Sequence, residues 1–252
     1  VSNYMTMQTT DQTHLVNAND SLVRAIKGIQ GVSHVQRYSQ KQGVLKTDND
    51  FLGVMFKGIG EDYDTTFIAG NMVAGTMPHL SMEKSTRQIL ISKNMADKLH
   101  LAVGNKVFAY FLGDDEVRAR PFTVVGIYQT NLTRYDESIC FTDLYTVSRL
   151  NGWQCLPDEN LYEVTGMEVS TVAFDSISSV EDRIISKINK TVDSEGNPLT
   201  SATIHDLAPQ IFSWLDLLDL NVWIILALMI CFSGFTMISG LLIIILERSS
   251  MI

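Results

Sequence analysis

One uncharged, apolar segment near the C-terminal end limits the folds open to this chain more than any other feature. No charged residue occurs from Val222 to Leu246, a run of about 25 positions, and a run beyond roughly 18 indicates a membrane-spanning helix. At 1.5 Å per residue this helix would be roughly 37 Å long, enough to cross a hydrocarbon core of about 30 Å. We therefore expect a transmembrane helix over residues 222–246.

Small residues within this segment indicate that other helices pack against it. Ser233, Thr236 and Gly240 are spaced i, i+3 and i+7 and fall on one stripe of a helix. Small residues let another helix approach closely, with Thr236 and Gly240 forming a small-xxx-small pair. These three are the candidate helix-packing residues.

Charges at the two ends of the segment predict its orientation. Acidic residues precede it, and Glu247 and Arg248 directly follow it. Because positive residues concentrate on the cytoplasmic side of membrane proteins, we expect Glu247 and Arg248 at the cytoplasmic edge. The residues before the span would then lie outside the cytoplasm.

The charge balance of the chain excludes one class of partner. The 252 residues carry a net charge of −9, whereas proteins that bind nucleic acids need a basic face. We therefore expect no nucleic-acid partner.

Residues before the apolar segment alternate between strand and helix patterns, which indicates an α+β fold. Near the N-terminus we expect a helix from about Ser21, with Asn19 and Asp20 as possible caps, and then a strand from Val32 to Tyr38. The middle predicts a hairpin followed by short strands and helices, at residues 43–60, 89–92, 94–100, 106–111, 121–127, 138–141 and 143–150. The end predicts a strand, a helix and a strand, at residues 166–172, 178–192 and 201–204. From Leu207 a helical stripe then leads into the apolar segment, with no break after Pro209.

The sequence lacks the motifs of known catalytic and cofactor sites. Residues 70–77 (GNMVAGTM) have the glycine spacing of a phosphate-binding loop without its Lys-Ser/Thr pair, and we interpret them as an ordinary loop. The histidines are scattered, without the spacing of metal ligands. We expect no catalytic residue, cofactor or metal in this chain. Whether Cys140 and Cys155 form a disulfide stays open, because sequence alone does not bring their Cβ atoms together.

Two stretches carry a family resemblance: ILISKNMADKLHLAVGNKVFAYF, and then PFTVVGIYQTNLTRYDESICFTDLYTVSRLNGW. They resemble the extracytoplasmic domain of ABC-transporter permeases of the MacB, FtsX and lipoprotein-releasing (LolC/LolE-like) type. The shared features are a strand, a helix ending in "A..L.L", a glycine turn, a strand, a variable hairpin, an "f.VvGi" strand and a short helix. They fall on Ile89 to Ile91, Ala96, Leu99, Val103-Gly104, Val107, Phe122, Val124 to Ile127, and Leu144 to Leu150.

The resemblance implies a MacB-like domain organisation and a permease with four membrane helices. One helix would precede Val1 and two would follow Ile252. The expected parts are two pieces of a porter-like β-α-β subdomain (1–80 and 161–206), an inserted β-rich, sabre-like subdomain (81–160), a stalk helix (207–221) and the transmembrane helix (222–246).

The same resemblance implies the function and the partners. In this family a separate cytoplasmic ATPase drives a pair of permeases, so no ATP hydrolysis is expected on this chain. The implied partners are that ATPase, a second permease subunit in a homo- or heterodimer, and the lipid of the bacterial inner membrane, with residues 1 to about 221 periplasmic. The nearest likeness is to the lipoprotein-releasing branch, which implies lipoprotein release or export and adds a periplasmic carrier or lipoprotein as a partner.

One hairpin departs from the carrier-recruiting permease of that branch because it is short. It carries Arg118, Arg120 and Pro121, whose charges suit an acidic partner; a solvated charged tip explains them equally well. This is the candidate partner-binding hairpin.

A second interpretation of the whole chain stays open. The soluble part would be an extracytoplasmic binding or sensor domain, and the single span would be its tether, with no further membrane helix after Ile252. The sequence does not decide the transported or extracted substrate.

Overall fold

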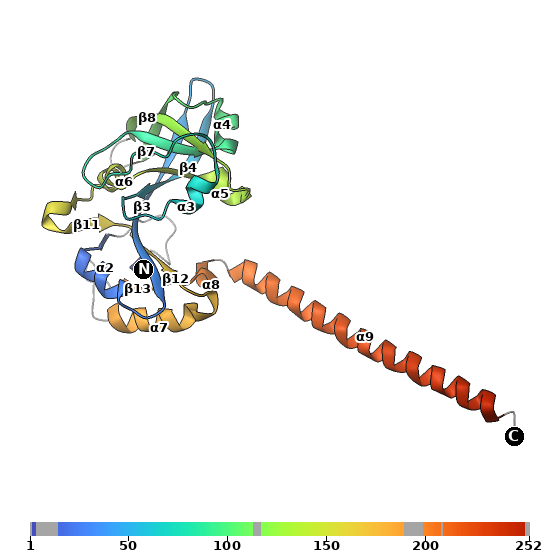
Figure 1. The fold of residues 1–252 in the computed structure, drawn as a ribbon. Coiled ribbons are helices and arrows are strands. Elements are labelled where there is room, and N and C mark those ends of the chain that lie inside the picture. Colours follow the sequence, from blue (N-terminus) through green and yellow to red (C-terminus); the bar gives the residue numbers. More distant parts are fainter. Residues whose placement is uncertain (1, 4–14, 113–116, 189–198, 208, 250–252) are drawn as a thin grey trace. The chain divides into compact units, whose positions relative to one another are not determined.

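The computed structural model divides into two compact units, Val1–Ala202 and Thr203–Ile252 (Figure 1). It describes residues 2–3, 15–112, 117–188, 199–207 and 209–249.

The long strand β3 (Val32–Lys46) organises the first unit. Its N-terminal half pairs antiparallel with β12 (Gly166–Thr171), and its C-terminal half pairs antiparallel with β4 (Phe51–Ile59). At Tyr38 the strand is paired with both neighbours. One strand thus runs from the layer of α2 and α7 into the layer of β4, β7 and β8 (Figure 1).

The expected hairpin at residues 43–60 is confirmed, but its first strand is longer than the sequence predicts. The expected strand from Val32 and the first arm of the hairpin are one continuous strand. The polar residues 39–42 between them continue the strand instead of marking a break, and Ser39 among them is held inside the protein. Ser39 is fully buried, and its Oγ lies 3.0 Å from the Oγ of Ser148.

Six strands of the first unit close into a β-barrel. Neighbouring strands pair in the order β3, β4, β9, β6 and β8, and β7 pairs with both β8 and the last three residues of β3. Closure leaves these six strands without a free edge between them. The strands not yet given are β6 (Gln88–Ser92), β7 (Lys106–Leu112), β8 (Val117–Tyr128) and β9 (Ile139–Asp143).

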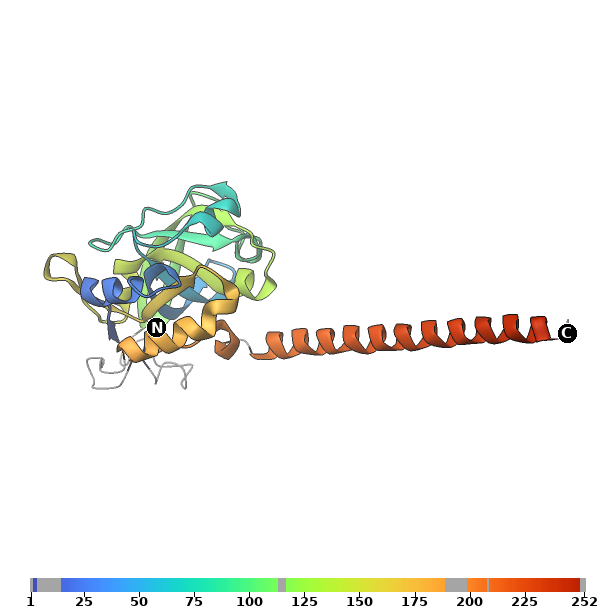
Figure 2. The same ribbon diagram turned by 60° about the horizontal axis from the view of Figure 1, so that its bottom comes forward.

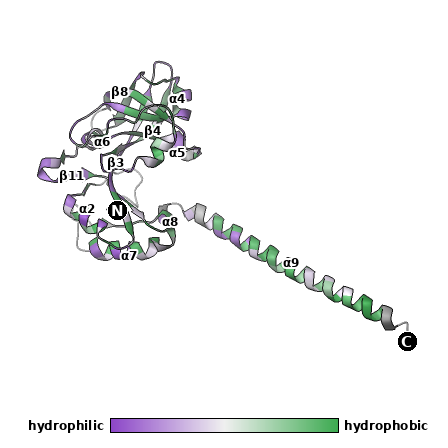
Figure 3. Cartoon of the chain, viewed as in Figure 1, coloured by the Kyte–Doolittle hydropathy of each residue, from purple (hydrophilic) through white to green (hydrophobic). Residues whose placement is uncertain are grey.

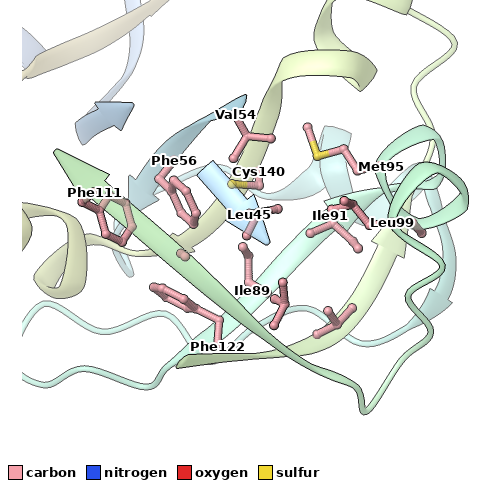
Figure 4. Packing of buried hydrophobic residues seen from close by; sticks show 14 of the residues in the cluster. Leu45, Val54, Phe56, Ile89, Ile91, Met95, Leu99, Phe111, Phe122 and Cys140 are labelled. Atoms are coloured by element: carbon pink, nitrogen blue, oxygen red, sulfur yellow. The ribbon is translucent and has the colours of Figure 1, made fainter. Parts of the chain in front are cut away.

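Alternate residues of the barrel strands fill its interior, as the period of two in a strand requires. Phe56 lies at the centre, with ring centroids 4.8 Å from Phe111 and 5.6 Å from Phe122 (Figure 4). Helix α4 (Lys93–Leu99) adds three residues to the same cluster. Its buried members include Leu45, Val54, Ile89, Ile91, Met95, Ala96, Leu99, Val107, Ala109, Val124 and Cys140.

A second core lies where helices α2 (Asp20–Lys27) and α7 (Ile177–Ile188) pack beside β12 and the first half of β3. Figure 2 turns α7 toward the viewer. The side chain of Asn19 caps α2 by accepting a hydrogen bond from the Leu22 N–H at 2.8 Å, so the expected start of this helix is confirmed. The core comprises Val16, Ala18, Ile26, Val35, Leu144, Cys155, Tyr162, Val164, Met167, Val180, Ile184, Ile188 and Leu199.

Several short elements complete the first unit. A three-stranded sheet has the order β10, β11, β2, and β1 pairs with β13. The remaining bounds are β1 (Ser2–Asn3), β2 (Val16–Asn17), α3 (Thr66–Gly70), β5 (Met72–Gly75), α5 (Thr133–Ser138), α6 (Leu144–Leu150), β10 (Cys155–Leu156), η1 (Pro157–Glu159), β11 (Leu161–Val164), η2 (Phe174–Ser176) and β13 (Leu199–Thr200).

Residues 70–77, interpreted as a loop, are instead the end of α3 followed by the edge strand β5, so that expectation is wrong. Strand β5 pairs antiparallel with β8. Gly75 has φ +78°, and a Cβ atom on it would come within 2.2 Å of the Val125 carbonyl oxygen. Glycine at this position therefore allows the backbones of β5 and β8 to approach each other closely.

The expected strand at 201–204 is also wrong, because β13 ends at Thr200 and residues Ile204–Leu207 form α8. The expected helix at 178–192 is α7 as far as Ile188. Its remaining residues lie outside the described part of the chain.

The second unit contains one long helix, α9 (Pro209–Ser249), of 41 residues. Proline suits the first turn of a helix, because the N–H groups there have no acceptor within the helix and no hydrogen bond is lost with proline. The helix expected at 222–246 is confirmed as the apolar part of α9. Among the described residues this is the one helix long and apolar enough to cross a membrane, with mean hydropathy 2.4 in an 18-residue window of Ser213–Leu246 (Figure 3).

Replacing Gly43 by alanine should destabilise the first unit. A Cβ atom at Gly43 would lie 2.8 Å from Phe111 and 3.0 Å from Phe56, whose rings are packed edge to face. Overfilling such a core costs about 1–3 kcal/mol. Thermal unfolding followed by near-UV circular dichroism measures the loss.

Gly53→Ala is the matched control, because a Cβ atom at Gly53 would meet nothing within 4 Å. Equal stability of the two variants would show that Gly43 does not face the barrel interior.

Candidate functional site

The stripe of small residues lies in the apolar part of α9. The Thr236 hydroxyl donates to the carbonyl oxygens of Phe232 and Ser233, at 3.1 and 2.9 Å. The hydroxyl thus finds its acceptors within the helix, because the apolar core of a bilayer offers no hydrogen-bond partner. A Cβ atom on Gly240 would meet nothing within 4 Å. The packing role of Ser233, Thr236 and Gly240 stays a prediction.

The expected cytoplasmic edge lies in the last turn of α9. The helix backbone continues through Glu247 and Arg248 to Ser249. The side chains of Glu247 and Arg248 lie outside the described part of the chain, so their place at the membrane edge stays a prediction.

The candidate hairpin is formed by β7 and β8, and its tip (113–116) lies outside the described residues. Arg118 is paired with Phe111 and Arg120 with Ala109 across the two strands. Both arginines are exposed. They and Pro121 line a pocket of about 400 Å³.

Two further arginines line the same pocket, and no sequence motif indicated them. Arg87 comes from the segment before β6, and Arg149 comes from α6. Neither is near Arg118 in the sequence. Arg87 comes beside β8 because β6 pairs with β8, and the packing of α6 brings Arg149 to the same pocket. Both the strand register and the helix packing are needed to reveal the cluster.

A buried ion pair that sequence reasoning missed links β4 to β12. Lys57 Nζ lies 2.5 Å from Glu168 Oε1 and 2.9 Å from the Tyr63 hydroxyl. Gln36 Nε2 donates to the other carboxylate oxygen of Glu168 at 2.9 Å. Burial acts to raise the pKa of Glu168, but the charge of Lys57 and the hydrogen bonds it accepts outweigh burial, and its pKa lies below 4.5.

A second buried cation, Arg37, lies on the neighbouring part of β3. Its guanidinium contacts Asp20 at 2.5 Å and Asp62 at 3.2 Å, and its Nε donates to the Ala18 carbonyl oxygen at 2.7 Å. The group also lies over the Tyr162 ring, 4.0 Å from the centroid. Burial raises the pKa of Asp62 despite the opposing charge of Arg37.

These two clusters hold elements of the first unit together. Each joins a cation on one strand to carboxylates on other elements, where β3 changes its pairing partner. Among the described residues, no three His, Cys, Asp or Glu side chains are placed to hold a metal ion. The bonds of both clusters tie β3 and β4 to α2, to β12 and to Asp62.

The disulfide left open by the sequence is not formed. Cys140 and Cys155 are free thiols, buried in the barrel core and in the second core respectively. Burial raises the pKa of both thiols, that of Cys155 to about 11.

Acidification should remove the stability that Glu168 contributes. Its folded pKa lies below its ordinary value of 4.5, so the unfolded chain binds the proton more readily. The contribution is complete well above pH 4.5 and is lost as pH falls through the depressed folded pKa. The difference in urea midpoint between wild type and Glu168→Gln should therefore shrink from pH 7 to pH 3.

Glu83→Gln serves as the control, because Glu83 is exposed and lies outside this network. A difference between wild type and Glu168→Gln that stayed constant with pH would contradict the assigned ion pair.

The sequence and the fold were compared with known proteins. Residues 2–193 match the family of the MacB-like periplasmic core domain. No functionally curated protein matches the chain.

Similar solved structures share 15–17% identity with this chain. The extracellular domain of the noncanonic ABC-type transporter YknZ from Gram-positive bacteria is 17% identical, with a TM-score of 0.48, over 73% of this chain and 90% of that one. The periplasmic region of MacB from Actinobacillus actinomycetemcomitans is 16% identical, with a TM-score of 0.45, over 69% and 75%. A domain of a putative permease protein from Porphyromonas gingivalis is 15% identical, with a TM-score of 0.41, over 77% and 86%.

The family match covers most of the chain, and the mixed α+β fold expected from the sequence is confirmed. The apolar helix α9 follows the matched region and indicates a membrane-anchored protein. The chain therefore belongs to the family of MacB-like periplasmic core domains, which are parts of ABC-transporter permeases.

Proposed function

We propose that this chain is a permease subunit whose outer domain uses ATP hydrolysis by a separate cytoplasmic ATPase to do work outside the inner membrane. Lipoprotein release or export is the task we assign to it. The family membership supports the permease role. No ATP hydrolysis is proposed on this chain itself.

The continuity of α9 is the observation that carries this proposal. Its 41 residues correspond to about 60 Å of helix, roughly twice the thickness of a hydrocarbon core. About half of the helix would therefore project beyond the bilayer. A continuous helix carries movement along its axis, whereas a flexible linker would absorb that movement. A simple tether has no need of this length.

We also propose the subdomain organisation and location that the sequence suggested. Residues 1–80 and 161–206 would form the porter-like subdomain, and residues 81–160 the inserted sabre-like one. The presence of two cores supports two subdomains, although Leu45, Val54 and Phe56 of the barrel core come from before residue 81. Residues 207–221 would form the stalk, and residues before the span would lie in the periplasm.

The proposed partners follow from the same role. They are the cytoplasmic ATPase, a second permease subunit, inner-membrane lipid and a periplasmic carrier or lipoprotein. The small-residue stripe of α9 supports close contact with another membrane helix. The hairpin with Arg118, Arg120 and Pro121 is the candidate surface where cargo or carrier meets the domain.

A flexible insertion in α9 should uncouple ATP hydrolysis from release. Seven Gly/Ser residues between Leu220 and Asn221 would interrupt the helix just before the apolar run. Seven alanine-rich residues at the same place are the matched control, because they keep the helix within about 20° of its original phase. Both versions of the full-length protein would be reconstituted with the ATPase from the native membrane.

The expected result is ATP-driven lipoprotein release that survives the helical insertion and is lost with the flexible one. ATPase binding should be unchanged in both. A full-length protein that purifies without any ATPase, and works equally well with either insertion, would favour a tethered sensor domain.

Gly240→Leu should weaken assembly of the permease. A leucine on the small-residue stripe would keep a neighbouring helix at a distance. Gly234→Leu is the matched control, because at 3.6 residues per turn Gly234 lies about 130° around the helix from the stripe. Neither site has an atom of this chain within 4 Å of an added Cβ, so a difference must come from another helix.

Disulfide crosslinking or fluorescence transfer between labelled subunits in proteoliposomes measures the assembly. A clear loss for Gly240→Leu alone is expected. Equal assembly of the two variants would show that the small-residue stripe does not lie in the interface.

A further inference from the structure

The pocket between β8, α6 and the segment before β6 has the size of a small-molecule site. Its volume of about 400 Å³ falls within the range of roughly 300–1,000 Å³ typical of ligand pockets. Its lining residues are Ser85, Arg87, Arg118, Arg120, Pro121, Phe122, Tyr145, Thr146, Arg149, Leu150 and Gly152.

The pocket gathers positive charge in an otherwise acidic protein. Four of the nine arginines of the chain line it, and none of its lining residues is acidic. The ion pairs found among the described residues belong to Arg37, Lys57 and Lys98, so none involves these four. Guanidinium groups placed around one hollow repel each other unless an anion lies between them.

The pocket walls are fixed to each other by a buried carboxylate. Asp143 is fully buried and accepts from the Thr146 N–H at 2.7 Å, which caps α6. Its other oxygen accepts from the N–H and the hydroxyl of Thr86, at 3.1 and 2.7 Å. The segment that carries Arg87 is thus tied to the helix that carries Arg149. The walls are preorganised for a ligand.

The backbone of Arg87 points to the same conclusion. This residue has φ +53°, a left-handed conformation that is uncommon outside glycine and clusters at ligand sites. Its carbonyl oxygen accepts from the Thr123 N–H of β8 at 2.9 Å. The strained residue therefore stays beside the strand that carries Arg118 and Arg120.

The chemistry of the lining selects the class of ligand. Arginine forks match the oxygens of a phosphate, which carries more charge than one carboxylate. Ser85, Tyr145 and Thr146 add hydroxyl groups, and Phe122 and Leu150 add apolar surface for an organic part. We propose that this pocket binds an organic phosphate, either a soluble metabolite or the headgroup of an anionic lipid. This site shares Arg118, Arg120 and Pro121 with the candidate partner surface, but it does not rest on the coupling proposed above.

The test uses the full chain in nanodiscs of zwitterionic lipid, titrated with pyrophosphate and with glycerol phosphate in a calorimeter. Wild type should bind both. Arg120→Gln and Arg149→Gln should each weaken binding about tenfold, and the double variant about a hundredfold. Arg149→Lys keeps the positive charge but loses the bidentate hydrogen bonding of the guanidinium. Its affinity for phosphate should lie between those of wild type and Arg149→Gln. Melting temperatures without ligand show whether each variant is folded.

Arg24→Gln is the matched control, because Arg24 is exposed on α2 and the substitution removes the same charge. A second series uses nanodiscs that contain phosphatidylglycerol. Weaker pyrophosphate binding there would identify the lipid headgroup as the source, and unchanged binding would identify a soluble phosphate.

Three results would overturn the proposal. They are no binding of either phosphate by wild type, equal loss in Arg24→Gln, and binding of a polyglutamate peptide in the absence of phosphate binding. The last result would assign the pocket to an acidic protein partner.

Discussion

The buried cations Arg37 and Lys57 determine how β3 can be shared between two cores. Strand β3 leaves β12 for β4 near Tyr38, and its charged neighbours are buried at this point. A buried charge is tolerated only with partners. Here the partners Asp20, Asp62 and Glu168 come from elements outside the barrel. A one-residue shift of β3 would turn each of its side chains to the opposite face of the sheet. It would also separate Arg37 from its carboxylates. Both the hydrophobic pattern and the ion pairs therefore specify the register of β3.

This arrangement suits a domain that moves as one rigid body. The barrel core and the α2–α7 core contact the same strand, and the ion pairs bridge the place where its pairing changes. Motion of one core relative to the other would separate the buried cations Arg37 and Lys57 from their carboxylates, and a buried charge without a partner is unfavourable. A domain that performs mechanical work needs such stiffness, whereas an enzyme that closes on its substrate needs a hinge. The proposed role in transmission is consistent with this contrast.

The sequence predicted those elements whose signals are local. Helix α2 has its cap at Asn19, α4 its N-cap at Ser92, and α9 its long uncharged run, so each could be located from nearby residues. The continuity of β3 could not be predicted from the sequence. Its buried polar residue Ser39 lies within hydrogen-bond distance of Ser148 on α6, a residue distant in the sequence. Strand β5 was missed because its partner is distant β8. Of the arginine pocket, the sequence indicated only the three residues on the hairpin, Arg118, Arg120 and Pro121. Arg87 and Arg149 join them through strand pairing and helix packing.

The position of α6 connects the arginine pocket to the strand that both cores share. Ser148 lies within hydrogen-bond distance of Ser39, and Asn151 Nδ2 donates to the Gln40 carbonyl oxygen at 3.0 Å. Helix α6 is therefore fastened to β3 on one side while Arg149 faces the pocket on the other. An anion held by Arg149 and Arg120 would join β8 to this fastened helix. Because a ligand stabilises the state that binds it, occupancy of the pocket would favour the geometry of the barrel in which β8 and α6 are closest.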